Sequence, residues 1–203
     1  DPHYYALKTS SYVSRLRGEH EIYLQVCPHP TTINCYSFWI HKGSAWLQLE
    51  LASGGCIKND LFNFDRTTAV RLFADIAYSL YNIHSLDLMH LDVSPANILR
   101  CETNVGDVFK LCDMGTTLQV GKFEEDCEGA GPYVSPETLG FPNLGIPVGC
   151  PTDIFSFGVV MMEVLTHKAA PRSYPKYDDL RNGKFDLSII PEEFAIVRDM
   201  LNP

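Results

Sequence analysis

The pattern of hydrophobic and polar positions changes between the front and the back of the chain. Two apolar and aromatic runs, 33–40 and 45–51, are separated by the polar residues 41–44, and this arrangement predicts a β-hairpin. A shorter apolar run at 4–8 suits another strand. Between these runs, apolar positions recur at helical spacing over 16–26. The front of the chain is therefore expected to combine strands with one helix.

In the back of the chain the pattern becomes helical. Residues 69–83 carry an apolar stripe at helical spacing, and 153–165 are apolar on most sides, which predicts a buried central helix. Residues 191–201 are amphipathic and predict a last helix. We therefore expect an α+β fold of two lobes, a small strand-rich lobe at 1–52 and a larger helical lobe at 53–203.

Composition excludes several classes of protein. With 203 residues and 45% apolar content, the chain can bury one sizeable core or two small lobes. A formal net charge of −9 argues against nucleic-acid binding, which needs a basic face. The seven cysteines are scattered and never spaced as CxxC, which favours a reduced cytoplasmic or nuclear protein over a disulfide scaffold or zinc site. No signal peptide and no apolar run approaching the ~20 residues of a membrane span is present, so no membrane contact is expected within these residues.

The most informative polar residues lie between the two long predicted helices. Asp92 is followed by Asn97, and Asp113-Met114-Gly115 comes next along the chain. Phosphoryl transfer to a protein hydroxyl needs one carboxylate at the hydroxyl proton, and an amide and a second carboxylate that hold magnesium over the ATP phosphates. The alternative for Asp92 is a loop residue that caps a turn, and an Asp-x-Gly sequence is by itself a common turn.

These residues, taken in order, resemble the catalytic domain of eukaryotic protein kinases, and the resemblance extends over essentially the whole chain. It implies a bilobal fold, protein kinase activity, and ATP and Mg²⁺ as cofactors. The matching segments are the lysine strand at 6–8, Glu19 on the front helix, the catalytic loop at 90–97, Asp113-Met114-Gly115 in place of DFG, Ser135-Pro136-Glu137 in place of APE, and the central-helix motif at 152–158.

The family resemblance implies catalytic and metal-binding roles. Asp92 would orient or deprotonate the substrate hydroxyl, and Asn97 and Asp113 would ligate magnesium. Lys8 would bridge the ATP phosphates and pair with Glu19, with Glu21 as the fallback partner. The alternative for Lys8 is a solvated lysine at a strand edge.

The resemblance also implies an adenine site at the junction of the two lobes. A gatekeeper side chain would lie behind the adenine ring, three hinge residues would offer backbone groups, and two apolar side chains would sandwich the ring. Each of these residues is equally well explained as ordinary core. The residues are, in that order, Leu49 as gatekeeper, Glu50, Leu51 and Ala52 as hinge, and Ala6 and Leu99 around the ring.

Within the kinases, the segment HLDVSPANIL at 90–99 is similar to HLDVKPANIF of the Wee/Myt group. Leu91 in place of arginine, the Glu-Gly pair at 128–129, and the pattern of residues over 171–191 favour the same group. Its members phosphorylate and inhibit cyclin-dependent kinases. The resemblance therefore implies a cyclin-dependent kinase–cyclin complex as substrate, a role at the G2/M transition, and membrane association only through flanking segments.

Two substitutions depart from the family pattern. Ser94 replaces the catalytic-loop lysine that stabilises charge on the transferred phosphoryl group, and Ala130 replaces the partner of that lysine. One lost charge-stabilising donor costs about 2.7–4 kcal/mol in other enzymes. The chain also begins only seven residues before Lys8, without a glycine-rich loop, and ends before the last helices of the family. We expect a piece of a longer protein that binds ATP poorly by itself.

Three functional hypotheses follow from these features. The first is an active Wee/Myt-like kinase that phosphorylates Thr or Tyr. The second is a catalytically impaired pseudokinase that acts as a binding or scaffold module, which the two substitutions at 94 and 130 favour. The third is an active kinase of another subfamily.

Overall fold

A computed structural model describes residues 4–123, 131–140 and 145–202. Ala130 and the Glu-Gly pair at 128–129 lie outside the described residues. In chain order the strands and α-helices are β1 (Tyr5–Ser10), α1 (Val13–Val26), β2 (Cys35–His41), β3 (Ser44–Glu50), α2 (Arg66–His84), β4 (Leu88–Met89), β5 (Ile98–Thr103), β6 (Gly106–Leu111), β7 (Leu118–Gln119), α3 (Pro136–Leu139), α4 (Pro151–Thr166), α5 (Lys176–Arg181) and α6 (Ala195–Met200). Short 3₁₀ turns lie at Ile57–Asn59, Leu61–Asn63, Met114–Thr116, Gly131–Tyr133, Leu187–Ile189 and Glu192–Phe194.

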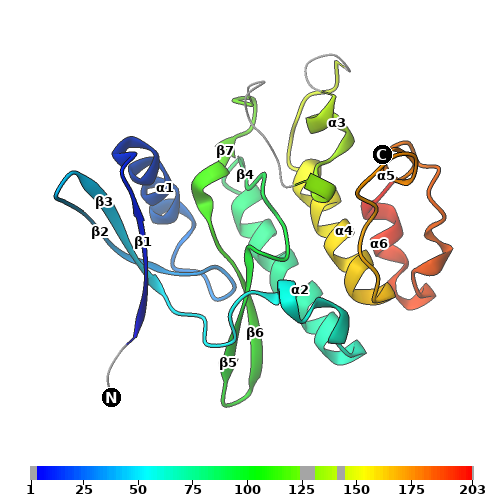
Figure 1. Cartoon of the computed structure of the whole chain (residues 1–203), viewed down its shortest axis with the longest axis horizontal. Helices are drawn as coiled ribbons and strands as arrows, with labels where there is room; N and C mark the ends of the chain where they lie inside the picture. Colours follow the sequence, from blue (N-terminus) through cyan, green and yellow to red (C-terminus); the bar gives the residue numbers. More distant parts are fainter. Residues whose placement is uncertain (1–3, 124–130, 141–144, 203) are drawn as a thin grey trace.

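The front of the chain forms a three-stranded antiparallel sheet in the order β1-β3-β2, with α1 packed against it (Figure 1). Ala6 of β1 lies opposite Leu49 of β3, and Lys8 lies opposite Leu47. Because side chains alternate between the two faces of a strand, Ala6 and Lys8 share the half-buried face of β1. The three predicted strands and the front helix are present, although their bounds differ from the prediction, and the α+β class is correct.

The start of β2 differs from the prediction for a specific reason. The apolar run was expected to begin a strand at Ile33, but β2 begins at Cys35. Ile33 instead donates its backbone N–H to the carbonyl of Leu111, at 2.9 Å, and Leu111 donates to Thr31 at the same distance. This segment therefore joins the front of the chain to the end of β6.

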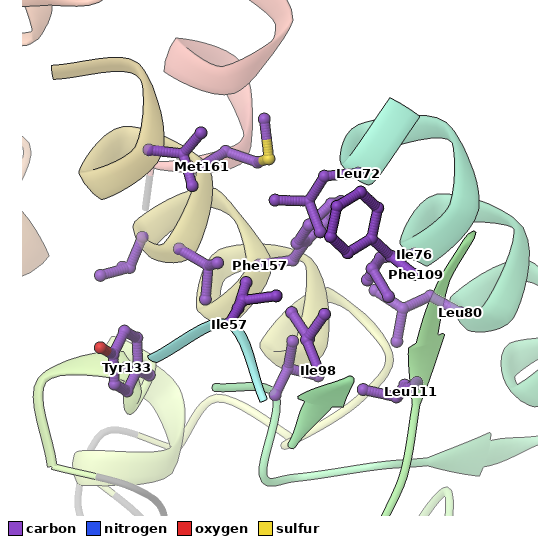
Figure 2. Close-up of a cluster of buried hydrophobic side chains, with 14 of the residues drawn as sticks. Ile57, Leu72, Ile76, Leu80, Ile98, Phe109, Leu111, Tyr133, Phe157 and Met161 are labelled. Atoms are coloured by element: carbon purple, nitrogen blue, oxygen red, sulfur yellow. The ribbon is translucent and has the colours of Figure 1, made fainter. Parts of the chain in front are cut away.

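The back of the chain is built around two long helices, α2 and α4, with the β5–β6 hairpin beside α2 (Figure 1). Their apolar side chains meet in one cluster, which the close-up in Figure 2 shows. The labelled members of this cluster are Ile57, Leu72, Ile76, Leu80, Ile98, Phe109, Leu111, Tyr133, Phe157 and Met161. Among the described residues, no helix combines the length and the apolar content that crossing a membrane requires.

The last predicted helix is shorter than expected. A helix was predicted over 191–201, but a 3₁₀ turn occupies Glu192–Phe194 and α6 covers only Ala195–Met200. Pro191 has an extended conformation with ψ of 145°, so the chain cannot continue a helix through it. The β5–β6 hairpin and the short helices α3 and α5 were not predicted.

Gly158 allows α4 and α6 to approach closely, and this contact yields a stability prediction. A Cβ at position 158 would lie 3.0 Å from Met200 Cβ and 3.1 Å from Leu201 Cδ2. Gly158→Ala should therefore destabilise the fold by about 1–3 kcal/mol, since it overpacks this contact. At Gly18, inside α1, a Cβ would meet no neighbouring atom within 4 Å. Gly18→Ala should stabilise by about 0.5–1 kcal/mol.

Chemical denaturation of both variants measures these two free energies of unfolding. Equal stabilisation by the two alanines would contradict the close contact between α4 and α6.

Candidate active site

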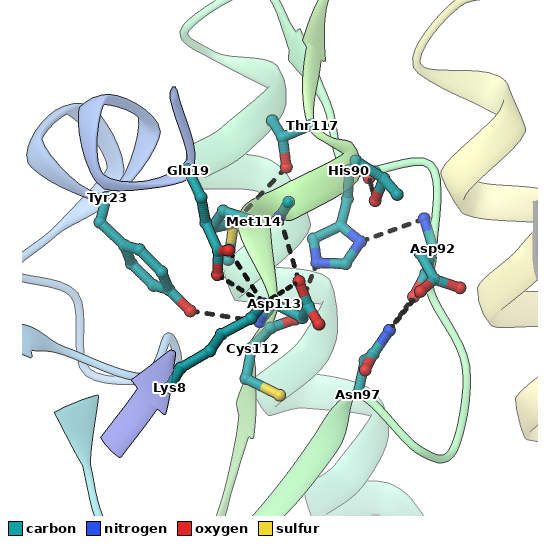
Figure 3. Close-up of polar contacts among 12 residues, drawn as sticks. Lys8, Glu19, Tyr23, His90, Asp92, Asn97, Cys112, Asp113, Met114 and Thr117 are labelled. Carbon is teal, nitrogen blue, oxygen red and sulfur yellow. Dashed lines mark hydrogen bonds and ion pairs between the residues drawn. The ribbon is translucent and has the colours of Figure 1, made fainter. Parts of the chain in front are cut away.

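Three segments that are distant in sequence meet at the amine of Lys8. Lys8 Nζ lies 2.9 Å from the carboxylate of Glu19 on α1 and 2.8 Å from Asp113 Oδ1, just after β6 (Figure 3). The side chain of Glu19 is only 2% exposed. It lies on the buried stripe of α1 with Leu16 and Tyr23, whereas Glu21 is exposed. Glu19, and not Glu21, is therefore the carboxylate on α1 that contacts Lys8.

The charges of this cluster control one another. Burial lowers the pKa of Lys8, but its hydrogen bonds to Asp113 and Glu19 outweigh that effect and raise the pKa overall. Burial raises the pKa of Asp113, but the hydrogen bond and positive charge of Lys8 outweigh it, so the net pKa lies below the usual value. For Glu19, the effect of burial outweighs the hydrogen bond and positive charge of Lys8, so the pKa of Glu19 is raised. At neutral pH the cluster therefore holds a cationic Lys8 against an ionised Asp113.

The backbone around Asp113 is held in an unusual conformation. Asp113 has φ of 63°, in the left-handed region that non-glycine residues rarely adopt. Its N–H donates to the hydroxyl of Tyr23 at 3.2 Å, and its Oδ1 accepts the N–H of Gly115 at 3.1 Å. Met114 is buried beside it, where the family usually has phenylalanine. The polar contact of Tyr23 was not predicted, because a tyrosine on a buried helical stripe carries no signal beyond its place in the core.

The catalytic-loop segment is anchored by Asp153 at the start of α4. This carboxylate is fully buried and accepts hydrogen bonds from the backbone N–H groups of His90 and Leu91 and from His84 Nε2, each at 2.8 Å. Leu91 has φ of 66°, so the chain turns sharply just before Asp92. His90 in turn accepts the N–H of Asp92 through Nδ1, at 3.2 Å, and donates from Nε2 to a backbone carbonyl. Asp153 and His90 thus position Asp92.

Asp92 and Asn97 contact each other directly. Asn97 Nδ2 donates to Asp92 Oδ2 at 2.7 Å and to the Asp92 carbonyl at 2.9 Å (Figure 3). Burial raises the pKa of Asp92, and the hydrogen bond from Asn97 offsets this only in part. A carboxylate with a raised pKa is a better proton acceptor.

The donor set fits a magnesium ion that also binds phosphate. The orientation of Asn97 leaves its Oδ1 for a further ligand, and Asp113 Oδ2 receives no hydrogen bond from the described part of the chain. One amide oxygen and one carboxylate oxygen suit a hard cation that takes its remaining ligands from phosphate and water. Across 4–123, 131–140 and 145–202, no cluster of three His, Cys, Asp or Glu side chains could hold a metal by protein ligands alone.

Ser94 lies inside the same loop. The residue is 4% exposed, and its carbonyl accepts the N–H of Asn97 at 3.0 Å. It therefore contributes to the shape of the loop through its backbone, while its side chain supplies no charge.

Three of the residues expected around adenine pack together. Leu49, Ala52 and Leu99 pack in a small apolar cluster with Ile33, Cys101 and Cys112. Ala6 lies opposite Leu49 across β1 and β3, whereas the Leu51 side chain is half exposed at 50%. Burial raises the pKa of Cys112 to about 12, so its thiol is neutral.

Glu50 is held by two residues that were not predicted from the sequence. Lys110 Nζ lies 2.6 Å from Glu50 Oε1, and Asn34 donates to Glu50 Oε2 from Nδ2 at 2.9 Å. The backbone N–H of Glu50 also donates to the Asn34 carbonyl, at 2.9 Å. The Lys110 contact links β3 to β6 across 60 residues, and the Asn34 contacts link β3 to the residue before β2. Both are tertiary contacts without a local signature.

The fold and this constellation of residues define a protein kinase domain. The protein kinase domain family matches residues 3–191, and the chain belongs to this family. Members of the family use ATP and Mg²⁺.

The relatives include members of the Wee/Myt group. The chain is 31% identical to the mitosis inhibitor protein kinase mik1 of Schizosaccharomyces pombe, over 80% of this chain and 28% of that protein. It is 27% identical to the membrane-associated tyrosine- and threonine-specific cdc2-inhibitory kinase wee-1.3 of Caenorhabditis elegans, over 96% of this chain and 28% of that protein. A probable serine/threonine-protein kinase of Dictyostelium discoideum is 32% identical over 86% of this chain and 19% of its own length. The chain therefore spans less than a third of each of these relatives.

Removing the Lys8 charge should reverse the pKa shift of Asp113. In Lys8→Met burial becomes the dominant influence, so the pKa of Asp113 should move above its usual value. In the wild type the lowered pKa contributes stability at neutral pH that is lost as the pH falls through the folded-state pKa. The stability difference between wild type and variant should therefore shrink on acidification. Carboxylate NMR titration measures the pKa directly, with Lys176→Met as control, and an unmoved Asp113 would refute the coupling.

The Glu50–Lys110 contact should be a strong coupling in the fold. Both side chains are largely buried, at 20% and 11% exposed, so Lys110→Met should cost about 1.5–3 kcal/mol of unfolding free energy. A double-mutant cycle with Glu50→Gln, followed by chemical denaturation, isolates the pair. The exposed Arg66–Glu193 pair, 3.7 Å apart, is the control and should couple by less than about 1 kcal/mol. Equal coupling in the two pairs would contradict the prediction.

Proposed function

We propose that this chain transfers the ATP γ-phosphate to a Thr or Tyr hydroxyl of a protein substrate. One observation supports this most directly, the amine of Lys8 held between Glu19 and Asp113 at 2.9 and 2.8 Å. A lysine in that place is available to phosphate oxygens and is fixed in direction by two carboxylates.

Each polar residue has a role in this proposal. Lys8 binds the α- and β-phosphates, and Glu19 positions Lys8. Asn97 and Asp113 hold the magnesium ion, which neutralises charge on the phosphates when bound. Asp92 accepts a hydrogen bond from the substrate hydroxyl and takes its proton, which its raised pKa favours.

The adenine ring is proposed to lie between the front and back lobes, divided near residue 52. Ala6 and Leu99 contact its two faces, and Leu49 lies behind it. The backbone of Glu50, Leu51 and Ala52 hydrogen-bonds to the ring edge. Support comes from the apolar cluster around Leu49, Ala52 and Leu99.

The proposed substrate is a cyclin-dependent kinase in complex with cyclin, phosphorylated so that entry into mitosis is restrained. The names of the relatives support this choice, since one is a mitosis inhibitor kinase and another inhibits cdc2. The protein would act in the nucleus or cytoplasm. The relative from Caenorhabditis elegans is membrane-associated by name, and any such association here would involve segments outside these residues.

Ser94 favours a second candidate, a kinase-like binding module without turnover. The serine side chain supplies no positive charge where the family lysine contacts the transferred phosphoryl group. A pseudokinase of this kind would keep the polar cluster for nucleotide binding or for folding.

Phosphoryl transfer by the full-length protein separates the two candidates. With ATP, Mg²⁺ and a cyclin-dependent kinase–cyclin complex, Asp92→Asn should lower the rate by about 10²-fold or more. Ser94→Lys should raise it by about 10²- to 10³-fold, going by the loss of one charge-stabilising donor elsewhere. Asp107→Asn is the matched control, since Asp107 is a half-buried carboxylate on β6 that pairs with Arg100 at 3.9 Å.

The two candidates predict different results. Transfer that Asp92→Asn abolishes and Asp107→Asn spares would exclude the binding module. No transfer by the wild type, together with a gain in Ser94→Lys, would overturn the active kinase.

A further inference from the structure

A cavity of about 370 Å³ opens beside the catalytic loop, on the side of Ser94. Four separate segments enclose it, namely the catalytic loop, the turns that follow β3, the segment after residue 130, and the end of α4 with the loop behind it. Its walls are largely apolar. The lining residues are Lys58, Leu61, Phe62, Ser94, Pro95, Ala96, Gly131, Pro132, Tyr133, Glu163, Ala169 and Arg172.

The only carboxylate among these lining residues, Glu163, is engaged inside the protein by two hydrogen bonds. It is 1% exposed, and both of its oxygens are already bonded. Oε2 accepts the hydroxyl of Tyr133 at 2.8 Å, and Oε1 accepts the backbone N–H of Ala170 at 2.7 Å. Glu163 therefore links α4 to the segment at 131–133 by a hydrogen bond, and both of its oxygens are engaged within the protein.

The two cations of the cavity are available. Lys58 and Arg172 are both exposed, and neither forms an ion pair with any carboxylate in the described residues. They come from different segments, the first 3₁₀ turn after β3 and the loop after α4, and both line the same hollow. Two positive charges over largely apolar walls, without an ion-pair partner among the described residues, attract a negatively charged side chain.

The sequence around Arg172 reinforces this charge. The stretch 164–177 carries Lys168, Arg172 and Lys176 and contains no Asp or Glu, although the whole chain has 25 acidic residues against 16 Lys and Arg. In a chain of net charge −9, a basic stretch at the rim of a cavity is a local departure from the average. Through Arg172 this stretch adds positive charge to the lining of the cavity.

We propose that this cavity binds an anionic side chain of the protein substrate, carried a few residues away from the phosphorylated hydroxyl. The proposal rests on the proposed function, and it names a substrate class that the function alone does not define: proteins with Asp or Glu near the target Thr or Tyr. The apolar side chains of Leu61, Phe62 and Pro132 contact the rest of the extended segment. Lys58 and Arg172 bind the carboxylate.

The geometry of the loop supports a substrate position. Tyr133 lines this cavity and also lines the small hollow that contains Asp92. An extended peptide advances about 3.3 Å per residue. A chain whose hydroxyl lies at Asp92 would therefore run past Tyr133 into the cavity within a few residues.

Peptide binding to the full-length Asp92→Asn protein tests this proposal without turnover. The probes are fluorescein-labelled peptides with a central Thr or Tyr and flanking Glu, Gln, Lys or phosphoserine residues, read by fluorescence polarisation. The Glu peptide should bind more tightly than the Gln peptide, and the Lys peptide most weakly. Lys58→Glu and Arg172→Glu should each weaken Glu-peptide binding by about three- to tenfold.

Matched controls distinguish binding in the cavity from a general effect of the charge of the protein. Lys176→Glu makes the same charge reversal on the same basic stretch, but outside the cavity, and it should leave the preference for Glu over Gln intact. Higher salt should weaken binding of the Glu peptide more than of the Gln peptide. A tighter complex with the Glu peptide than with the phosphoserine peptide would support a carboxylate ligand, and a tighter complex with the phosphoserine peptide would overturn the carboxylate in favour of phosphate.

The outcomes distinguish this inference from the proposed function. Preferential binding of anionic peptides without any phosphoryl transfer would support the cavity and overturn the kinase activity. Phosphoryl transfer with equal binding of the Glu and Gln peptides would overturn the proposed role of the cavity in binding an anionic side chain. It would leave the proposed kinase activity unaffected. An effect of Lys176→Glu equal to that of Arg172→Glu would also overturn the cavity.

Discussion

The contact of one amine with two carboxylates organises the front of this molecule. Glu19 and Asp113 would repel each other in a partly dry site, and Lys8 between them makes their approach favourable. The three residues lie on β1, on α1 and behind β6, so the contact can form only when those segments have already packed. The cluster that would hold the ATP phosphates therefore depends on correct packing of the front of the chain against the back.

A third carboxylate, Asp153, organises the back of the molecule. It is buried, yet each bond it makes is short and comes from a donor in a fixed segment, so its charge is compensated by hydrogen bonds. This arrangement lets Leu91 adopt its left-handed conformation, which turns Asp92 toward Asn97. The rigid helix α4 thereby determines where the catalytic loop lies, and the two centres together set the direction of both Asp92 and Asp113.

Much of the fold could be predicted from sequence wherever one periodic signal dominates. α1 and α2 each bury one apolar face, α4 is apolar and buried on most sides, and the front hairpin consists of two apolar runs around a polar turn, so the types of all four were correct. The β5–β6 hairpin was missed because its exposed positions interrupt the apolar pattern, and the contacts of Tyr23 and Lys110 were missed because they join residues far apart in the chain. Ordered polar motifs could be assigned to roles by resemblance, but tertiary contacts of single side chains have no signature in one sequence.

The distribution of positive charge gives this kinase domain its particular character. At position 94, where the family places a lysine next to the transferred phosphoryl group, the chain has a neutral serine, and Lys8 is the cation that contacts Glu19 and Asp113 within the described residues. Lys58 and Arg172, which form no ion pair within the described residues, instead line the cavity beside Ser94. In the binding role proposed above, these cations attract an anionic substrate, whereas the family lysine that Ser94 replaces lies next to the transferred phosphoryl group. The positive charge would then serve substrate binding rather than the chemical step.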